Sequence, residues 1–317
     1  MNSRSCRTIL VTGAGGFVGQ HVLHALAACE QPPNRIVGLD KQERKSAYCD
    51  WVVCDMTDEA EVVPLIRRIR PDGVIHLAGV THAPDPHSYF RSNVLGCASL
   101  LSAVVNSGKR PRIIVVGTAA QYDLSAANGQ PITEQSPLAC AEPYGLSKNL
   151  QEQWALMYAR CESLPLCCAR IFNILGPGQP PTLVPATFLQ QLLQVRQSRR
   201  PEVHVGHTNT ERDFIDVRDV ARALVKVLIG DKFVTGECFN IASGKTVKVA
   251  EILRACLELA GQPNITVITD LARTKAADAR TAAADTSKLR SLIDWQPKIH
   301  WRESIKDMWL QIKHSAQ

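Results

Sequence analysis

Tyr144 and Lys148 are the residues whose types and spacing are best suited to chemistry, and they lie four positions apart in the segment PYGLSK. In a helix this spacing places both side chains on one face. A phenol has a pKa of about 10 and transfers protons poorly at neutral pH, but a neighbouring ammonium stabilises the phenolate and lowers that pKa. Thr118, at the end of an apolar segment, would add a hydroxyl that binds the reacting oxygen. The three residues indicate acid–base catalysis at a substrate oxygen.

A glycine-rich segment near the start of the chain predicts the cofactor. Gly13, Gly16 and Gly19 follow a short apolar strand and open a helix that begins at Phe17. Glycines permit the tight turn and let backbone N–H groups approach a pyrophosphate, whose charge the helix N-terminus favours. An acid, Asp40, closes the next predicted strand. Strand, glycines, helix and acid together predict a dinucleotide site, with Phe17 among its contacts.

Asp40 also bears on which dinucleotide is bound. A carboxylate at this position accepts hydrogen bonds from the ribose hydroxyls and repels a 2′-phosphate, which favours NAD. Three basic residues that follow it leave NADP possible: Lys41, Arg44 and Lys45. Asp55, after the third predicted strand, is placed either to contact the adenine or to cap a helix that begins near Glu59.

The order of predicted elements indicates an α/β fold. Strand and helix patterns alternate from residue 8, and the strands are apolar at nearly every position, as in a parallel sheet covered on both faces. We therefore expect a Rossmann-type doubly wound domain in 1–173, with return elements near 212–245. A connection rich in proline and glycine follows Asn173, and shorter elements come after it. This change predicts a smaller lobe in 174–317 that mainly binds substrate.

Composition excludes several other classes of protein. The chain has 317 residues, 45% hydrophobic and 21% charged, which is typical of a globular domain. Its net charge of +6 is not gathered into a basic stripe with aromatic residues, so we expect no nucleic-acid partner. No apolar stretch approaches the ~20 residues of a membrane span, and no histidine cluster has the ligands of a metal site. Eleven scattered cysteines without a C-x-x-C pair, and no signal segment, predict reduced thiols and a cytoplasmic location.

These motifs together resemble the extended short-chain dehydrogenase/reductase family, which acts on nucleotide-diphosphate sugars. The likeness spans nearly the whole chain and is carried by the glycine triplet, HLAG, SNVLG, Thr118, PYGLSK and RIFNILGPG. Within that family, the segments PITEQSPLACAEPYGLSK, FNILGPGQPP and ERDFIDVRDVARAL most resemble GDP-4-keto-6-deoxy-D-mannose reductases. The expected partner is therefore a nucleotide-diphosphate sugar.

The resemblance implies a role for each candidate catalytic residue. Tyr144 is the proton donor or acceptor, and Lys148 holds both Tyr144 and the nicotinamide ribose. Thr118 binds the substrate oxygen. Asn93, in SNVLG, lies near a bend of the active-site helix.

The resemblance also implies substrate contacts in the second half of the chain. Asn173 is placed toward the diphosphate, and Arg212 toward the phosphates, although Arg212 could instead pair with a neighbouring acid, Asp213 or Asp216. Lys275 stands where many relatives place an arginine that grips the phosphates. Two nearby arginines could substitute for it: Arg273 and Arg280.

The two residues after Thr118 decide between reactions. Sugar-nucleotide 4,6-dehydratases place an Asp-Glu pair there, whereas this chain has Ala119 and Ala120, which cannot carry a proton. Reduction or reversible oxidation remains. Our leading hypothesis is reduction of the C4 ketone of a nucleotide-linked 4-keto-6-deoxyhexose. The reductases of the family usually carry acids at these positions as well, and Asp40 suits an enzyme that retains NAD. A 4-epimerase of the UDP-hexose type is therefore the alternative, followed by a non-catalytic NAD-binding sensor.

A homodimer is a further implication of the resemblance. In relatives, two helices of each subunit, here 93–106 and 144–160, pair across a two-fold axis into a four-helix bundle. Six apolar residues of these segments could serve that interface or the core of the subunit: Leu100, Leu101, Val104, Leu150, Trp154 and Met157.

Overall fold

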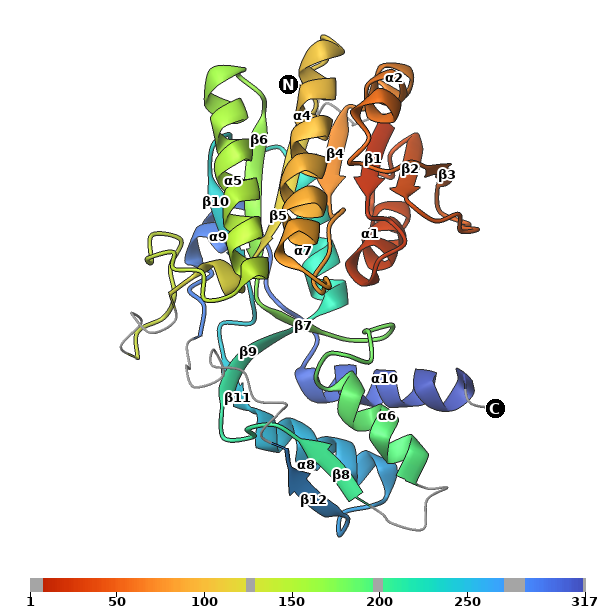
Figure 1. The fold of residues 1–317 in the computed structure, drawn as a ribbon, viewed down its shortest axis with the longest axis vertical. Helices are drawn as coiled ribbons and strands as arrows, with labels where there is room; N and C mark the ends of the chain where they lie inside the picture. Colours follow the sequence, from red (N-terminus) through yellow and green to blue (C-terminus); the bar gives the residue numbers. More distant parts are fainter. Residues whose placement is uncertain (1–7, 124–128, 196–201, 271–282, 316–317) are drawn as a thin grey trace.

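A seven-stranded parallel sheet forms the centre of the protein in a computed structural model that describes residues 8–123, 129–195, 202–270 and 283–315 (Figure 1). The strand order is β3-β2-β1-β4-β5-β6-β10. The strands are β1 (Thr8–Thr12), β2 (Arg35–Asp40), β3 (Asp50–Val53), β4 (Gly73–His76), β5 (Arg112–Thr118), β6 (Leu166–Ile171) and β10 (Cys238–Ile241). This order is that of a doubly wound fold, which confirms the predicted class. All seven carboxyl ends meet at one edge.

Helices cover both faces of this sheet, which is why its strands are apolar at nearly every position. The helices α1 (Phe17–Ala27) and α7 (Val217–Ile229) pack together on one face. The other face carries α2 (Glu59–Ile69), α4 (Gly96–Asn106) and α5 (Pro143–Cys161). A short helix, α9 (Ser287–Leu292), lies against β10.

Two features of the second face bear on the expected dimer. Leu100, Leu101 and Val104 are fully buried in the core between α4 and the sheet, so of the two roles expected for them they serve the core of the subunit. Their helical spacing predicted an apolar face, and the sheet of the same subunit covers it. Leu150 and Trp154 on α5 are exposed instead, and Met157 is half-buried.

A smaller lobe lies beneath the carboxyl ends of the strands (Figure 1). It contains a three-stranded sheet, β11-β9-β7, and a parallel pair, β12-β8. Its elements are β7 (Asn173–Leu175), β8 (Glu202–Val205), β9 (Glu211–Asp216), β11 (Thr246–Lys248), β12 (Thr266–Thr269), α6 (Ala186–Val195), α8 (Val249–Ala260) and α10 (Trp301–Ser315). Apolar residues of α6, α8 and α10 form a separate core, which includes Leu189, Ile252 and Trp309.

The chain passes between the two lobes more than once. After β9 it returns to the large lobe as α7 and β10, whereas β9 and β11 pair within the smaller lobe. We propose that the boundary between the two lobes lies between residues 173 and 174. No helix in the described part of the chain is long and apolar enough to cross a membrane.

Candidate active site

The glycine turn between β1 and α1 is shaped by contacts that a side chain would prevent. Gly13 has a φ of +68°, and a Cβ there would lie 2.7 Å from the amide nitrogen of Ala78. A Cβ on Gly19 would lie 2.3 Å from the carbonyl oxygen of Gly13. Close packing of β1, α1 and the segment after β4 therefore requires glycine at these positions.

The same turn leaves the start of α1 open to an anion. Gly16 caps the helix without a side-chain hydrogen bond, the first turn from Phe17 contains no acid, and the helix dipole places partial positive charge there. At the end of β2, Asp40 Oδ2 accepts a hydrogen bond from the amide of Gly15 at 2.9 Å. A carboxylate thus lies beside the turn, where a ribose would follow a pyrophosphate bound at α1. These residues fit a nicotinamide dinucleotide.

Asp55 and the basic residues after Asp40 lie close to this site. Asp55 Oδ2 pairs with Lys41 Nζ at 3.0 Å, and Asp55 Oδ1 accepts from the backbone of Thr57 at 2.9 Å. Burial raises the pKa of Asp55, but the bonds from Thr57 and Lys41 outweigh it and leave that pKa below its usual range. Asp58, not Asp55, caps α2, so the alternative role for Asp55 is wrong. Arg44 lies beside the glycine turn, because its Nε would be 3.1 Å from a Cβ on Gly15.

Thr118 and Tyr144 come together where β5 meets the start of α5. Thr118 ends β5 and begins a 3₁₀ turn, η2 (Ala119–Gln121), and its Oγ1 accepts from the amide of Ala120 at 3.3 Å. A Cβ on Gly145 would lie 2.3 Å from the carbonyl oxygen of Ala120. Glycine therefore lets the first turn of α5 pack directly against η2. This contact brings the hydroxyl of Thr118 close enough to the phenol of Tyr144 to lower its pKa slightly.

The protonation of Tyr144 and Lys148 follows from their burial. Burial raises the pKa of Tyr144 to about 12, against the smaller opposite effect of the Thr118 hydrogen bond. This is opposite to the direction expected from a neighbouring ammonium. The effect of burial dominates, and Lys148 is not among the groups that shift this pKa. The buried Nζ of Lys148 donates to Gln151 Oε1 at 2.5 Å. Burial also lowers the pKa of Lys148 to about 8.

Asn93 connects the loop after β4 to the active-site helix. It is fully buried in η1 (Phe90–Leu95), a π-helical turn that joins α3 (Pro86–Tyr89) to α4. Its Oδ1 accepts from the amide of Val80 at 2.8 Å, and its Nδ2 donates to Ser147 Oγ at 2.8 Å. A Cβ on Gly79 would lie 2.5 Å from Asn93 Oδ1, so glycine makes room for this side chain. Asn93 is thus tied to the residue that precedes Lys148.

Two of the expected substrate residues lie on neighbouring strands of the smaller lobe. Asn173 begins β7 and donates to the carbonyl oxygen of Asp213 at 3.1 Å, while Arg212 lies on β9 and donates to the carbonyl oxygen of Glu211 at 3.0 Å. The carboxylate of Asp213 accepts from the amide of Ser243 at 2.8 Å.

The sequence left two questions open about the phosphate contacts: which acid pairs with Arg212, and which basic residue near 275 contributes. Asp216, which was a possible partner of Arg212, pairs with Arg218 at 2.8 Å. Lys275, together with Arg273 and Arg280, lies outside the described residues.

Three buried polar residues behind the site were missed from the sequence: Gln121, Glu152 and Arg170. Glu152 and Arg170 form an ion pair with side-chain exposures of 2% and 5%. Two signals could have found them. Arg170 stands inside the apolar strand LCCARI, where a charge requires a buried partner, and Glu152 follows Lys148 by one helical turn.

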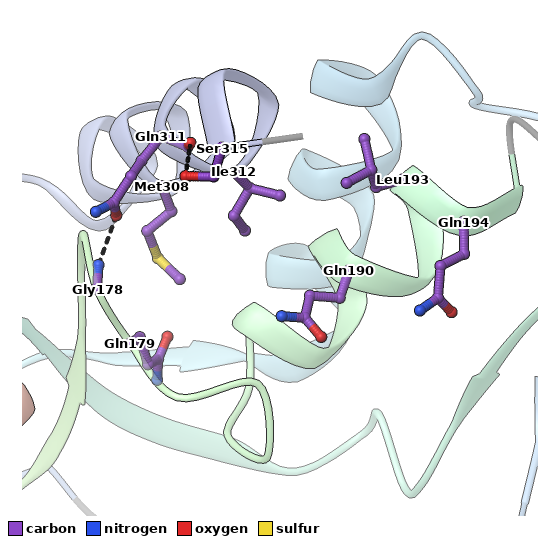
Figure 2. A pocket seen from close by; sticks show the side chains of 9 residues that line it. All are labelled: Gly178, Gln179, Gln190, Leu193, Gln194, Met308, Gln311, Ile312 and Ser315. Carbon is purple, nitrogen blue, oxygen red and sulfur yellow. Dashed lines mark hydrogen bonds between the residues drawn. The ribbon is translucent and has the colours of Figure 1, made fainter. Parts of the chain in front are cut away.

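A cavity of about 460 Å³ lies away from these residues, between α6 and α10 (Figure 2). Four of its nine lining residues are glutamines, and Gln311 Oε1 accepts from the amide of Gly178 at 2.6 Å. The lining residues are Gly178, Gln179, Gln190, Leu193, Gln194, Met308, Gln311, Ile312 and Ser315. None is charged and none is a predicted site residue, so we place the active site at the carboxyl edge of the sheet.

Comparisons with known proteins agree with this geometry. The GDP-6-deoxy-D-mannose reductase of Pseudomonas aeruginosa is 29% identical over 309 residues, covering 94% of this chain and 94% of that protein. The UDP-glucose 4-epimerase of Azospirillum brasilense is 29% identical over 310 residues, covering 92% and 87%. The solved structure of RMD from Pseudomonas aeruginosa complexed with NADPH has a TM-score of 0.84 and 27% identity, covering 98% and 99%.

A family profile decides the classification. The profile described as GDP-mannose 4,6 dehydratase matches residues 10–308, which is nearly the whole chain. The match confirms the resemblance to the extended short-chain dehydrogenases and reductases, and the chain belongs to the GDP-mannose 4,6-dehydratase family.

Proposed function

We propose that the protein is a nucleotide-sugar oxidoreductase that reduces the C4 ketone of a nucleotide-linked 4-keto-6-deoxyhexose with NAD(P)H. One observation carries this proposal. Thr118 and Tyr144 meet at the carboxyl edge of the sheet, while the turn that follows Thr118 begins with Ala119 and Ala120 and contains no acid. Elimination of water needs an acid and a base, and alanine supplies neither. Ketone reduction needs one proton donor and a hydride, and the similarity to a GDP-6-deoxy-D-mannose reductase supports it.

Each of the active-site side chains has a separate role in the reaction. A bound reduced nicotinamide supplies the hydride. Tyr144 is neutral at pH 7 because its pKa is about 12, so it donates its proton to the carbonyl oxygen as negative charge develops there. Thr118 binds the same oxygen. We assign Lys148 to the nicotinamide ribose and to the charge left on Tyr144, and Asn93 to the position of α5 through Ser147.

Cofactor and substrate contacts follow from the arrangement around the sheet edge. We propose that Gly13, Gly16, Phe17 and Gly19 bind the pyrophosphate, and that Asp40 and Asp55 face the adenosine. Asp40 favours NAD, while Arg44 beside the glycine turn leaves room for NADP, the cofactor in the RMD complex. Asn173, Arg212 and Lys275 are proposed for the substrate diphosphate.

A 4-epimerase is the second candidate, and two observations bear on it. Asp40 and the similarity to a UDP-glucose 4-epimerase favour it. An epimerase must first remove a proton from a hydroxyl, for which Tyr144 has to act as the phenolate, whereas reduction uses the neutral phenol. An epimerase retains NAD through purification and needs none added, which separates the two. A silent NAD-binding sensor has no need for the Thr118–Tyr144 contact.

We further propose a cytoplasmic homodimer. Five large apolar side chains are 41–50% exposed on η1 and α5, and together they form a surface suited to a second subunit. They are Phe90, Leu95, Leu146, Leu150 and Trp154. The ten described cysteines are free thiols, which suits a reducing compartment.

The proposed mechanism is tested by Tyr144→Phe. We expect kcat to fall by about 10²–10⁴-fold, the usual contribution of a general acid, with the Kd of the reduced cofactor unchanged. Tyr158→Phe on the same helix is the matched control and should leave both values unchanged. Near-normal turnover by Tyr144→Phe would rule the mechanism out.

A further inference from the structure

We propose that Gln121 is a positioning residue that holds Thr118 in register with the active-site helix. Its side chain is fully buried and makes two directional bonds. Oε1 accepts from the backbone amide of Thr118 at 2.8 Å, and Nε2 donates to Glu152 Oε2 at 3.0 Å. The amide group offers the acceptor and the donor that these two bonds need. One side chain thus connects the end of β5 to the middle of α5.

The sequence makes room for this bond. A Cβ on Gly117 would lie 2.4 Å from Gln121 Oε1, so the residue before Thr118 has to be glycine for the amide to approach. The turn η2 is also closed at its other side, where the Thr118 hydroxyl accepts from Ala120. Gln121 therefore holds the backbone of Thr118 through its amide group, while the hydroxyl of Thr118 remains on the side of Tyr144.

The far end of the bridge is anchored to two strands and a helix. Arg170 on β6 binds Glu152 through Nε at 2.9 Å and NH2 at 2.5 Å. Arg170 NH1 donates to the hydroxyl of Tyr122 at 2.8 Å, and that hydroxyl donates to Asn240 Oδ1 on β10 at 2.6 Å. Because the network is buried and fully paired at Glu152, it holds Gln121 in one orientation.

The geometry gives Gln121 an effect on turnover without contact with the reacting atoms. Tyr144, Lys148 and Glu152 follow one another at intervals of four residues along α5. Glu152 also acts on Lys148, since its charge raises the pKa that burial lowers. Loss of the Gln121 bridge would let Thr118 move relative to Tyr144, and misplacement of a catalytic group by about 1 Å can cost about 10²-fold in rate. This catalytic consequence rests on the proposed function.

Two substitutions test the bridge. Gln121→Met keeps the length of the side chain and removes both hydrogen bonds. Gln121→Glu keeps the shape but places a carboxyl group against Glu152. The titratable groups around this position are Glu152 and Lys148 on α5, Arg170 and Cys168 on β6, Cys238 on β10, and Cys140 with Tyr122 near the turn.

The introduced carboxyl group makes the second variant sensitive to pH. When protonated, it donates to Glu152 and accepts from Thr118, as the amide does. A neighbouring carboxylate raises its pKa, so this state is retained at low pH and lost as the pH rises. The ratio of kcat for Gln121→Glu to that of the wild type should therefore fall from pH 6 to pH 8. A residue that only fills space would give a constant ratio.

Turnover is measured with GDP-4-keto-6-deoxymannose and saturating reduced cofactor. We expect Gln121→Met to lower kcat at least about tenfold, with KM and the Kd of the cofactor within about twofold. Ser304→Ala is the matched control, because it removes a buried hydrogen bond to Asp216 in the smaller lobe. Unchanged kcat in Gln121→Met, an equal loss in Ser304→Ala, or a constant ratio for Gln121→Glu would overturn the proposal.

Hydrogen exchange at the Thr118 amide supplies a readout that needs no substrate. Loss of its bond to Gln121 should speed exchange by about fivefold to tenfold in Gln121→Met and leave Ser304→Ala like the wild type. If the wild type does not turn over, the proposed function fails while this exchange still decides the bridge: faster exchange supports it, and unchanged exchange overturns it. If Gln121→Met does not fold, Gln121→Glu compared at pH 6 and pH 8 gives the same decision.

Discussion

Replacing the buried partners Glu152 and Arg170 singly and together would show how this ion pair contributes to stability. Both side chains are almost fully excluded from water, and two hydrogen bonds join them. Glu152→Met leaves a guanidinium without its counter-charge, and Arg170→Met leaves a carboxylate. Removal of one member of a buried pair costs about 3–5 kcal/mol, whereas replacement of both by apolar residues is often close to neutral.

The structure refines these magnitudes. For a chain of this size, 1 kcal/mol corresponds to about 2 °C in Tm, so each single variant should unfold roughly 6–10 °C below the wild type. In the double variant the Nε2 of Gln121 loses its acceptor, at a cost of about 1–3 kcal/mol. The double variant should therefore be more stable than either single variant by about 2 kcal/mol, without reaching the wild type.

Thermal and urea unfolding followed by circular dichroism measure this cycle. The exposed pair Arg35–Asp50, at 2.8 Å with exposures of 48% and 63%, is the matched control, and its coupling should stay below about 1 kcal/mol. If the losses of Glu152→Met and Arg170→Met simply add in the double variant, the two residues are not coupled and our account of the buried network is refuted.

Two further predictions concern titration and cofactor choice. Burial, and secondarily Lys148, lowers the pKa of His76 to about 3, so between about pH 3 and 6.5 the unfolded state binds the extra proton and stability falls on acidification. From pH 7.5 to pH 5 the free energy of unfolding, measured with urea, should therefore fall by about 2 kcal/mol because of His76. His76→Asn should lack this part of the pH dependence. The same pH dependence of stability in both proteins would contradict the prediction. Asp40→Asn should raise the ratio of kcat/KM with NADPH to kcat/KM with NADH by about tenfold or more, because it removes a charge that repels a 2′-phosphate. Asp50→Asn on the next strand is the control and should leave this ratio unchanged. An unchanged ratio in Asp40→Asn would show that Asp40 does not select the cofactor.

The sequence predicted the elements that position the site because their signals are local. Residues 59–69 form α2 as expected, since acids begin the helix, basic residues end it and its apolar residues repeat at helical spacing. Gly13 marked the tight turn because its backbone conformation excludes a side chain. The proximity of Thr118 and Tyr144 followed from a strand end and a helix start at the same edge of a parallel sheet.

Other features depend on contacts that no local pattern contains. The direction of the Tyr144 pKa depends on the burial of its phenol in the folded chain, which the spacing of Tyr144 and Lys148 cannot show. The burial of Leu100 depends on which surface covers its helix face, which periodicity cannot identify. The sequence does not point to Gln121, because its buried partners lie far away in the chain. Glu152 is 31 positions from it, and Arg170, which binds Glu152, is 49 positions from it.

The central claim is ketone reduction, and it is tested most directly with purified protein, GDP-4-keto-6-deoxymannose and either NADH or NADPH. The account predicts that the added NADH or NADPH is oxidised, seen as loss of the reduced nicotinamide absorbance, and that this loss is about 10²–10⁴-fold slower in Tyr144→Phe. A lack of oxidation with either cofactor, together with release of NAD when the protein is denatured, would contradict the reductase assignment in favour of an epimerase.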